Sequence, residues 1–407
     1  KIIYCSEDLE AKRLCSKRSN AISYGFDNKD DIWCEIEKIR ESSTDFTVYA
    51  AEKKLGSITL GVPGKHNVLN ALAVVALANE LGMEFSEIAQ SMAEFRGARR
   101  RFDMLYKSSN YSIVDDYGHH PTEIKATIET AKQLNPERLV CVFQPHRYTR
   151  TKLMLDKFSG AFSGVDKLFI TEVYAAGEAP IVGADSNAIV ESIRKSTDTE
   201  VELIQCFESA HHVIGAYIKP GDQVLILGAG NVHEIGSLLA RDLEVIDKLR
   251  RELDDPMTEC RLYEPMRRHT TLKVGGPAQY WVEPITVESF SKSLGFFDRL
   301  NIPVRVIGRG SNLLICDGGI QGAVIHPSGG EFSEVSVSGN YITAGVGARF
   351  KKLNNIAKMH EISGFEWMEG IPGNVGGGLR MNAGAMGTET FDQVVSVKFL
   401  DSSGQIY

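Results

Sequence analysis

The chain has 407 residues, of which 43% are hydrophobic and 24% charged, and its net charge is -8. This composition indicates a soluble globular protein of about two to four domains and argues against a nucleic-acid partner, which requires a basic face. The seven cysteines include no C-x-x-C pair and no apolar run reaches the length of a membrane span, so we expect free thiols in the cytoplasm and no membrane segment.

The first hundred residues predict a small α/β segment. Strands are expected at residues 1–5 and 21–26 with a helix between them, and a hairpin at residues 46–50 and 57–62. A Pro/Gly turn then leads into a very apolar helix that ends at Gly82, and a second helix follows at 86–95. Near the start of the apolar helix lie His66, Asn67 and Asn70. The free amides of a helix start favour an anion there, although simple capping by these polar side chains is an open alternative.

A run of arginines, Arg99 to Arg101, follows the second helix. Such a run is usually a solvated charge cluster, but a guanidinium fork also suits phosphate oxygens. We expect a domain boundary at this run, with one domain over residues 1–98 and the next over residues 99–243.

Residues 101–243 alternate between strand and helix patterns. Strands are predicted at 112–115, 139–143, 167–172, 202–204 and 223–227, and helices at 122–134, 152–162, 187–195, 209–218 and 232–243. This alternation predicts a doubly wound, Rossmann-like α/β domain. The G-A-G-N sequence after the last strand lacks the acidic companion of a dinucleotide site, so we interpret its glycines as a tight turn.

Two strand ends in this domain carry unusual numbers of ionisable residues. Residues 114–121 are V-D-D-Y-G-H-H-P, and the strand at 139–143 is followed by Q-P-H-R-Y-T-R-T. Ligands of open α/β sheets collect at the carboxyl ends of strands. We therefore expect the two strand ends to be adjacent and to form one anion-binding pocket. Solvated surface loops are the alternative.

The remainder of the chain changes character. Residues 244–266 are highly charged and show no core pattern, so they are predicted to be a linker. Residues 301–407 are rich in glycine and in strand patterns, with few helices expected. The loop at 308–314 has the composition of a nest for a pyrophosphate, or of an ordinary hairpin turn. The glycines from 370 to 378 suggest close approach to a flat or phosphorylated ligand, while Ile371, Val375, Leu379 and Met381 are predicted to pack.

Two resemblances emerge from these motifs. Residues 1–243 resemble the Mur ligases of the UDP-N-acetylmuramate–L-alanine ligase type, through G-K-H-N-V-L-N-A-L-A, D-D-Y-G-H-H-P-T-E, F-Q-P-H-R-Y-T-R-T and E-V-Y-A-A-G-E-A-P-I. Residues 267–407 resemble UDP-N-acetylenolpyruvoylglucosamine reductase, through H-T-T-L-K-V-G-G, G-R-G-S-N-L-L and G-I-P-G-N-V-G-G-G-L-R-M-N-A-G-A-M-G. The resemblance implies a fusion of two steps of peptidoglycan precursor synthesis, in which the reductase product is the ligase substrate. The second part is expected to be an α+β FAD-binding domain.

The ligase resemblance assigns roles to the residues of the first part. Ligases of this type use ATP and Mg2+ to phosphorylate the muramate carboxylate, and the amine of L-alanine then attacks the acyl phosphate. The residues matched to the ATP site are His66, Asn67, Asn70, Arg101 and Asp116. The residues matched to the alanine and acyl-phosphate side are Tyr117, His119, His120, His146 and Arg147. Arg147 suits the carboxylate of alanine because guanidinium binds carboxylates bidentately.

The reductase resemblance implies FAD and NADPH as cofactors and UDP-N-acetylenolpyruvoylglucosamine as substrate. The residues matched to FAD are Gly308, Gly310, Ser311, Asn312, Leu313, Gly370, Ile371, Pro372, Gly373, Gly376, Gly377, Asn382, Ala383 and Gly384.

Parts of both sites have no counterpart in these residues. The ligase G-x-x-G-K-T loop and magnesium ligands would precede Lys1, and the later reductase segments would follow Tyr407. We therefore expect the chain to be cut from a longer protein and to carry neither complete site, with no metal ligands of its own. The alternatives are a non-catalytic nucleotide- and FAD-binding scaffold, a folyl- or cyanophycin-type ligase, and a wider FAD-linked oxidase.

Overall fold

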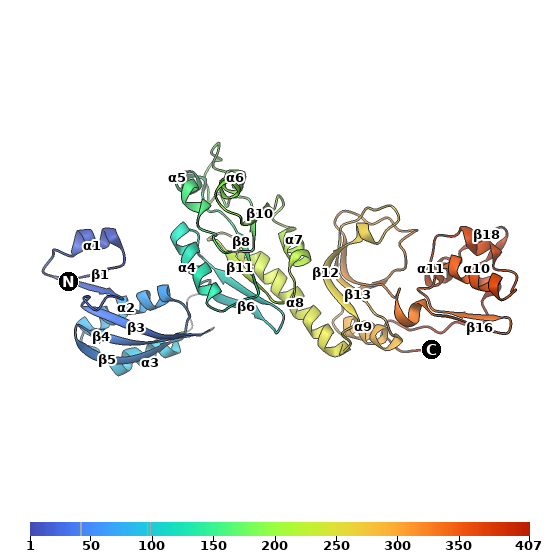
Figure 1. Cartoon of the computed structure of the whole chain (residues 1–407), viewed down its shortest axis with the longest axis horizontal. Helices are drawn as coiled ribbons and strands as arrows, with labels where there is room; N and C mark the ends of the chain where they lie inside the picture. Colours follow the sequence, from blue (N-terminus) through green and yellow to red (C-terminus); the bar gives the residue numbers. More distant parts are fainter. Residues whose placement is uncertain (41–42, 96, 98) are drawn as a thin grey trace. The chain divides into compact units, whose positions relative to one another are not determined.

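The computed structural model describes residues 1–40, 43–95, 97 and 99–407. The chain forms two compact units (Figure 1). The first comprises Lys1–Ala210 and Ile218–Ala240, and the second comprises His211–Tyr217 and Arg241–Tyr407. The predicted boundary between residues 98 and 99 falls on Ala98, which lies outside the described residues, as does Arg96 of the arginine-rich stretch.

The first unit begins with a mixed sheet of strand order β1-β2-β3-β4-β5. The strands are β1 (Ile2–Cys5), β2 (Ala21–Gly25), β3 (Ile32–Ile39), β4 (Thr44–Ala50) and β5 (Lys53–Leu60), and the helices are α1 (Leu9–Cys15), α2 (Lys65–Glu80) and α3 (Phe85–Glu94). Strands β1 to β3 pair in parallel and β3 to β5 antiparallel. Helix α2 buries Val68, Leu72 and Val75 in the core of this sheet. The predicted helices and hairpin are present, but β3 was not predicted.

The second sheet of this unit has the strand order β10-β9-β8-β11-β7-β6. Its strands are β6 (Asp103–Lys107), β7 (Ser112–Asp116), β8 (Arg138–Phe143), β9 (Lys167–Ile170), β10 (Glu200–Leu203) and β11 (Asp222–Leu227), and the helices along this stretch are α4 (Pro121–Lys132), α5 (Tyr148–Ser159), α6 (Ser186–Ser196), α7 (Ala210–Tyr217) and α8 (His233–Leu253). All pairs are parallel except β6 with β7. The doubly wound α/β prediction is therefore confirmed.

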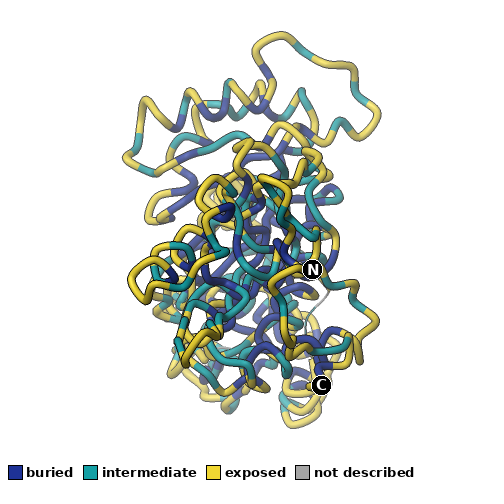
Figure 2. Tube along the Cα trace, turned by 90° about the vertical axis from the view of Figure 1, so that its right-hand side faces the viewer, coloured by how far each residue is buried: buried dark blue, intermediate teal, exposed yellow. Residues whose placement is uncertain are grey.

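The order of these strands corrects one prediction. Strands β7 and β8 were expected to be neighbours, but β11 lies between them and pairs with both. The turn Gly228–Asn231 that follows β11 therefore starts between the two polar strand ends. The central strands are almost wholly buried, and along its whole length the chain alternates between buried stretches and exposed loops (Figure 2).

The predicted linker at 244–266 is wrong, because these residues are ordered. Helix α8 continues to Leu253, and β12 (Glu259–Pro265) pairs with the next strand. The apolar residues of the helix recur every three or four positions and are buried at Leu243, Ile246 and Leu249. Its many charges lie between them and form ion pairs along the helix. The many charged residues of this stretch hid the apolar periodicity of an amphipathic helix in the sequence.

The second unit contains a sheet of order β12-β13-β15-β14 and smaller hairpins. Its further strands are β13 (Pro277–Glu283), β14 (Val304–Val306), β15 (Ile320–Ile325), β16 (Val335–Ser338), β17 (Tyr341–Ala344), β18 (Gly384–Ala385) and β19 (Thr388–Glu389). Its helices are α9 (Val287–Arg299), α10 (Phe350–Met359), α11 (Val375–Met381) and α12 (Thr390–Gln393), with 3-10 turns η1 (Met266–Arg268), η2 (Gly330–Ser333) and η3 (Glu366–Gly370). The stretch predicted to have few helices therefore contains α10, α11 and α12. In the part of the chain that the structure describes, no helix is both long and apolar enough to span a membrane.

A buried carboxylate ties α8 to the sheet of the second unit. Asp242 is 0% exposed and accepts hydrogen bonds from the hydroxyls of Tyr263 and Tyr280, the latter at 2.9 Å. The amide of Gln279 donates to the same carboxylate at 3.1 Å, as does Nε of Arg241. A buried charge held by several donors is costly to remove, because each donor then loses its partner.

We expect Asp242→Ala to destabilise the second unit by about 3–5 kcal/mol, because buried tyrosine hydroxyls would be left without an acceptor. Urea unfolding followed by tryptophan fluorescence measures the change. Arg241→Ala is the control and should cost less than about 1 kcal/mol, because that side chain is 59% exposed. Equal effects of the two substitutions would contradict the role given to Asp242.

Candidate functional site

The two polar strand ends converge, although their strands are not neighbours. The ring of His119, after β7, lies 5.6 Å from the ring of His146, after β8, measured between centroids. Tyr117 meets the His119 ring edge-on at 5.4 Å. The rings predicted from both motifs thus form one cluster, which the alternative of separate solvated loops does not explain.

The loop after β7 is held by a carboxylate of the helix that it enters. Oε2 of Glu123 in α4 accepts hydrogen bonds from the backbone N–H groups of His119 at 3.1 Å and His120 at 3.2 Å. Nδ1 of His119 lies 3.0 Å from the carbonyl oxygen of Tyr117 and 3.6 Å from the same Glu123 oxygen. The ring of His120 caps α4 by accepting from the N–H of Thr122 at 3.2 Å. The predicted catalytic role of His120 stays a prediction, beside this observed capping role.

The loop after β8 is held by the segment that follows β9. The N–H of Arg147 donates to the carbonyl of Tyr174 at 2.9 Å, and the N–H of Tyr174 donates to Pro145 at 2.8 Å. The Tyr174 ring stacks on His146 at 5.6 Å with an interplanar angle of 10°. On the other side, a guanidinium nitrogen of Arg150 lies 3.3 Å from Nδ1 of His146. Tyr174 and Arg150 therefore fix the plane and the orientation of this imidazole.

Arg147 lies at the start of α5 in an unusual backbone conformation. Its φ is 69° and its ψ 134°, a region that favours glycine. Its side chain is 51% exposed, and its guanidinium lies 3.8 Å from Glu178. Glu178 is itself fixed, because its carboxylate accepts from the N–H and the hydroxyl of Thr149 at 3.0 and 2.7 Å. A half-exposed guanidinium at a strained position, directly after His146 in the chain, is well suited to bind an anion.

Tyr174, Glu178 and Arg150 were not singled out from the sequence as site residues. All three belong to motifs that were recognised, E-V-Y-A-A-G-E and Q-P-H-R-Y-T-R-T. A strand was predicted at 167–172, and in the structure β9 pairs in parallel with β8. This pairing places Tyr174 and Glu178, which follow β9, at the same edge of the sheet as the residues that follow β8.

Asp116 and Arg100 are both bound to groups of the protein itself. The carboxylate of Asp116 is 2% exposed and accepts from the N–H groups of Phe102 and Gly118, both at 2.8 Å. This gives it a structural role, and its contact with ribose stays a prediction. Arg100 is drawn into the domain, where it pairs with Asp115 at 3.0 Å and donates to the carbonyl of Gly230 at 2.9 Å.

Arg101, the arginine matched to phosphate, remains accessible. Its side chain is 47% exposed, lies over the ring of Tyr117 at 5.7 Å, and approaches Glu123 only to 4.0 Å. Among the described residues, Glu123 at 4.0 Å is the only acidic partner found for Arg101, so its guanidinium is the one of the pair Arg100 and Arg101 that a phosphate could engage.

The residues predicted at the start of α2 are partly accessible. His66 and Asn67 are half-buried and Asn70 is exposed. The side-chain amide of Asn67 donates to the carbonyl of Pro63 at 2.7 Å. This bond is not an N-terminal cap, because a cap accepts from the free N–H groups, and among the described residues no side chain caps α2 at Gly64. Burial lowers the pKa of His66, against the opposing effect of Asp116. His66 therefore stays neutral near pH 7.

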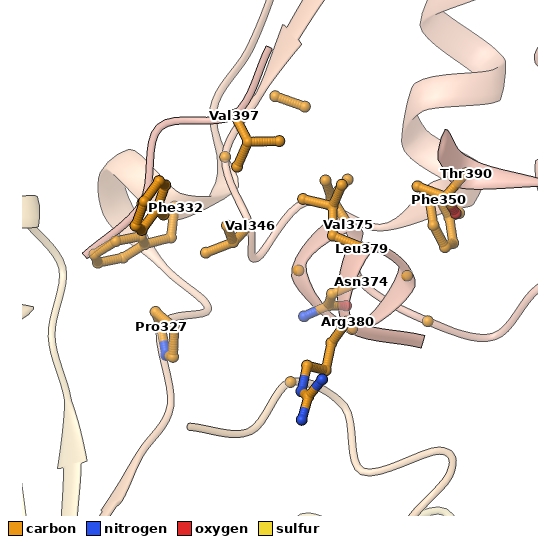
Figure 3. Close-up of a pocket in the computed structure, with 18 of the residues that line it drawn as sticks. Pro327, Phe332, Val346, Phe350, Asn374, Val375, Leu379, Arg380, Thr390 and Val397 are labelled. Atoms are coloured by element: carbon orange, nitrogen blue, oxygen red, sulfur yellow. The ribbon is translucent and has the colours of Figure 1, made fainter. Parts of the chain in front are cut away.

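In the second unit, the predicted glycine segments line one large open cavity of about 2910 Å3. Figure 3 shows part of this cavity, with Asn374, Val375, Leu379 and Arg380 of the α11 segment and, on another side, Phe350 next to Thr390. Of the predicted FAD residues, those that line it are Gly308, Gly310, Ser311, Asn312, Leu313, Ile371, Pro372, Gly373, Gly376, Gly377 and Ala383. Those that do not line it are Gly370, Asn382 and Gly384. Asn382 instead ends α11 with φ 44°, and its side chain bonds Glu389 and the N–H of Phe391.

The glycines of α11 differ in what they face. A Cβ at Gly376 or Gly378 would meet Val346 at 2.9 Å or the Phe350 ring at 2.0 Å, so these two glycines allow the chain to pack on itself. A Cβ at Gly377 would meet nothing within 4 Å. Gly376, Gly377 and Gly378 belong to the helix α11, and the approach of this segment to a ligand stays a prediction. Met381 is 60% exposed, so its predicted packing role is wrong.

Comparisons with known families match three stretches of the chain. Residues 2–78 match the Mur ligase middle domain, residues 100–230 the Mur ligase glutamate ligase domain, and residues 278–407 an FAD binding domain. The chain carries Mur ligase middle and C-terminal domains together with an FAD-binding domain.

The relatives found are similar over the Mur ligase part. A UDP-N-acetylmuramate–L-alanine ligase of Syntrophus aciditrophicus is 40% identical over 247 residues, which are 60% of this chain and 52% of that protein. One of Nitratidesulfovibrio vulgaris is 39% identical over 236 residues, 58% of this chain and 52% of that protein. The crystal structure of a UDP-N-acetylmuramate–alanine ligase from Thermotoga maritima aligns with a TM-score of 0.47 at 29% identity, over 55% of this chain and 48% of that one. The chain spans about half the length of the curated relatives it matches.

The residues that line the cavity of the second unit fit a flavin nucleotide. The loop that begins at Gly308 contains Gly310, whose φ of 61° and approach to the carbonyl of His269 exclude a side chain. Asn374 is 4% exposed and its Oδ1 has no hydrogen-bond partner among the described residues. The open face at Gly377 leaves room for a planar group. A bound dinucleotide would therefore find a glycine loop, an unsatisfied polar atom and an unobstructed helix face in one cavity.

Proposed function

We propose that this chain belongs to a bifunctional cytoplasmic enzyme of peptidoglycan precursor synthesis. Its Mur ligase part would join L-alanine to UDP-N-acetylmuramate at the expense of ATP. Its FAD-binding part would reduce UDP-N-acetylenolpyruvoylglucosamine with NADPH. The convergence of His119, His146 and Arg147 at one sheet edge is the single observation that carries the ligase proposal.

The cluster provides the groups that the ligase reaction needs. L-alanine is a zwitterion, so its site needs a cation for the carboxylate and a neutral acceptor near the ammonium. Arg147 supplies the cation. Burial lowers the pKa of both His119 and His146, so both rings are neutral near pH 7. Holding the amine beside an activated acid supplies most of the acceleration in a reaction of this kind.

The ATP side is proposed at the start of α2 and at Arg101. Burial keeps His66 neutral, Asn70 is exposed, and the guanidinium of Arg101 is accessible to a phosphate. Magnesium would accompany ATP, as it does in phosphoryl transfer generally.

The FAD-binding part is proposed to act as the reductase. When bound, FAD supplies hydride transfer between NADPH and the enolpyruvyl double bond. The loop from Gly308 and the helix α11 would bind and orient it. The support for this half is the FAD-domain match over residues 278–407 and the shape of the cavity.

The proposal is tested with the purified protein that carries these domains. ATP-dependent incorporation of radiolabelled L-alanine into UDP-N-acetylmuramate tests the ligase half. Oxidation of NADPH that depends on UDP-N-acetylenolpyruvoylglucosamine tests the reductase half. A folded protein that binds ADP and FAD but catalyses neither reaction would contradict the proposal and indicate a nucleotide-binding scaffold.

A further inference from the structure

The hydrogen-bond partners of the two clustered imidazoles differ in kind. Nδ1 of His119 faces the carbonyl oxygen of Tyr117 at 3.0 Å and a carboxylate oxygen of Glu123 at 3.6 Å. Both partners can only accept a hydrogen bond. A neutral His119 must therefore carry its proton on Nδ1, which leaves the lone pair on Nε2.

His146 has the opposite arrangement. Its Nδ1 faces a guanidinium nitrogen of Arg150 at 3.3 Å. A guanidinium has no lone pair and can only donate. A neutral His146 must therefore accept at Nδ1 and carry its proton on Nε2. The two rings of the cluster are held as complementary tautomers, one a base and the other a donor, with centroids 5.6 Å apart.

We propose that His119 Nε2 is the base that takes a proton from the ammonium of the incoming amino acid. The Nε2–H of His146 donates a hydrogen bond to the anionic oxygen of the activated acid. Glu123 is the positioning residue of His119. The assignment rests on the proposed ligase function and gives each imidazole a separate task within it.

The bonding changes balance with these roles. The ammonium gives one proton to His119 Nε2, and the freed electron pair forms the C–N bond to the acyl carbon. The C–O bond to the phosphate breaks and its oxygen leaves with the electron pair. The second proton of the amine goes to the departing phosphate. The Nε2–H of His146 is well placed to stabilise the negative oxygen on the acyl carbon during attack, because it lies in the same ring cluster.

Glu123 is well suited to hold the base. Burial raises its pKa, but the hydrogen bonds from the backbone of His119 and His120 outweigh burial, and the net pKa shift is downward. Glu123 is therefore ionised near pH 7 and favours a proton on the nearest ring atom, Nδ1 of His119. A carboxylate that fixes the tautomer of a histidine base is a recurrent arrangement in enzymes.

Burial first, and the surrounding charges after it, shift the pKa of each ring. The pKa of His119 is lowered first by burial, then by Arg150 and His120, against the raising effects of the Tyr117 carbonyl and Glu123. The pKa of His146 is lowered by burial, Arg150, His119 and Arg147, and raised by Glu178. Each imidazole can therefore act in its neutral form at pH 7. Removing the charge of Glu123 should lower the pKa of His119 further.

Nitrogen-15 NMR of ring-labelled histidines tests the tautomers directly on the full chain. At pH 7.5 we expect His119 to show the Nδ1–H form and His146 the Nε2–H form. Substitution of each histidine by Gln assigns the signals. His119 in the Nε2–H form, or two rings in the same form, would overturn the inference even if the protein ligates alanine.

Kinetics test the roles. In the wild type, activity should decline at acidic pH as His119 becomes protonated. His119→Gln should lower the rate of ligation at pH 7 by about 100-fold or more and remove this decline. His146→Gln should slow the reaction but keep that decline. Glu123→Gln keeps an acceptor for the backbone amides, so it should fold and should move the decline to lower pH. Glu129→Gln, an exposed residue of the same helix, is the matched control and should leave the profile unchanged.

The two proposals fail in distinguishable ways. A wild-type protein without ligation activity contradicts the proposed function, whatever the tautomers are. A wild-type protein that ligates alanine, together with a His119→Gln variant that keeps the acid-side decline, contradicts only the assignment of the base.

Discussion

Arg147→Gly is expected to remove recognition of L-alanine without harming the fold. The φ of 69° at this position costs an arginine about 1–3 kcal/mol, whereas glycine adopts it freely. The only ion pair found for this side chain among the described residues is with Glu178 at 3.8 Å, and it is half-exposed. The variant should therefore be at least as stable as the wild type. The KM for L-alanine should rise about 100-fold or more, because the charge partner of its carboxylate is lost.

The measurements are the thermal unfolding temperature and the KM values for L-alanine and ATP. Only the KM for L-alanine should change strongly. Arg194→Ala removes an exposed arginine of α6 and serves as the control for loss of positive charge. A drop in stability of Arg147→Gly, with alanine kinetics unchanged, would show that Arg147 is retained for structure and not for the substrate.

Gly377→Ala is expected to weaken FAD binding by about 10- to 100-fold. The added methyl group meets nothing within 4 Å in the protein, so it should not disturb α11. It would instead project into the cavity, where overpacking against a planar group costs about 1–3 kcal/mol. Fluorescence titration with FAD measures the change in affinity.

Gly318→Ala is the matched control, since its Cβ also meets nothing within 4 Å and Gly318 does not line the cavity. It should bind FAD as the wild type does. Equal FAD affinity of Gly377→Ala and the wild type would show that the flavin does not approach α11.

The sequence predicted the elements of the first unit well where each element has its own periodicity. The helix α2 begins after a Pro/Gly turn, and the helix α4 begins at Pro121 after the cap His120. The doubly wound alternation of strands and helices is visible in the spacing of the apolar runs. Strand β3 was missed although Ile32, Cys34 and Ile36 alternate, because the charged residues Glu35, Glu37 and Lys38 concealed its half-buried face. The same effect concealed the last three turns of α8.

The order of the strands could not be predicted, because it depends on pairing between residues that are far apart in the chain. The motif that contains His119 and the one that contains His146 were expected to follow adjacent strands, yet β11 separates β7 from β8. The rings still meet because the loops extend beyond the strand ends. The tautomers of the two rings depend on Tyr117, Glu123 and Arg150 in three dimensions, and spacing alone does not reveal them.

The glycine segments contain glycines with different roles, which amino-acid composition alone does not distinguish. Gly310 needs glycine for its backbone conformation, Gly378 needs it for Phe350, and Gly377 needs it for neither. In sequence the three are equivalent. Only the packing around each position separates a glycine kept for the fold from one available to a ligand.

A crystal structure of the protein with its amide product, UDP-N-acetylmuramoyl-L-alanine, shows whether the two histidines and Arg147 bind the amino acid. We expect the alanine carboxylate at about 3 Å from the guanidinium of Arg147 and the amide nitrogen within hydrogen-bonding reach of His119 Nε2. An alanine moiety bound away from the edge of the sheet formed by β7, β11 and β8, with His119 and Arg147 both in contact only with protein, would contradict this expectation.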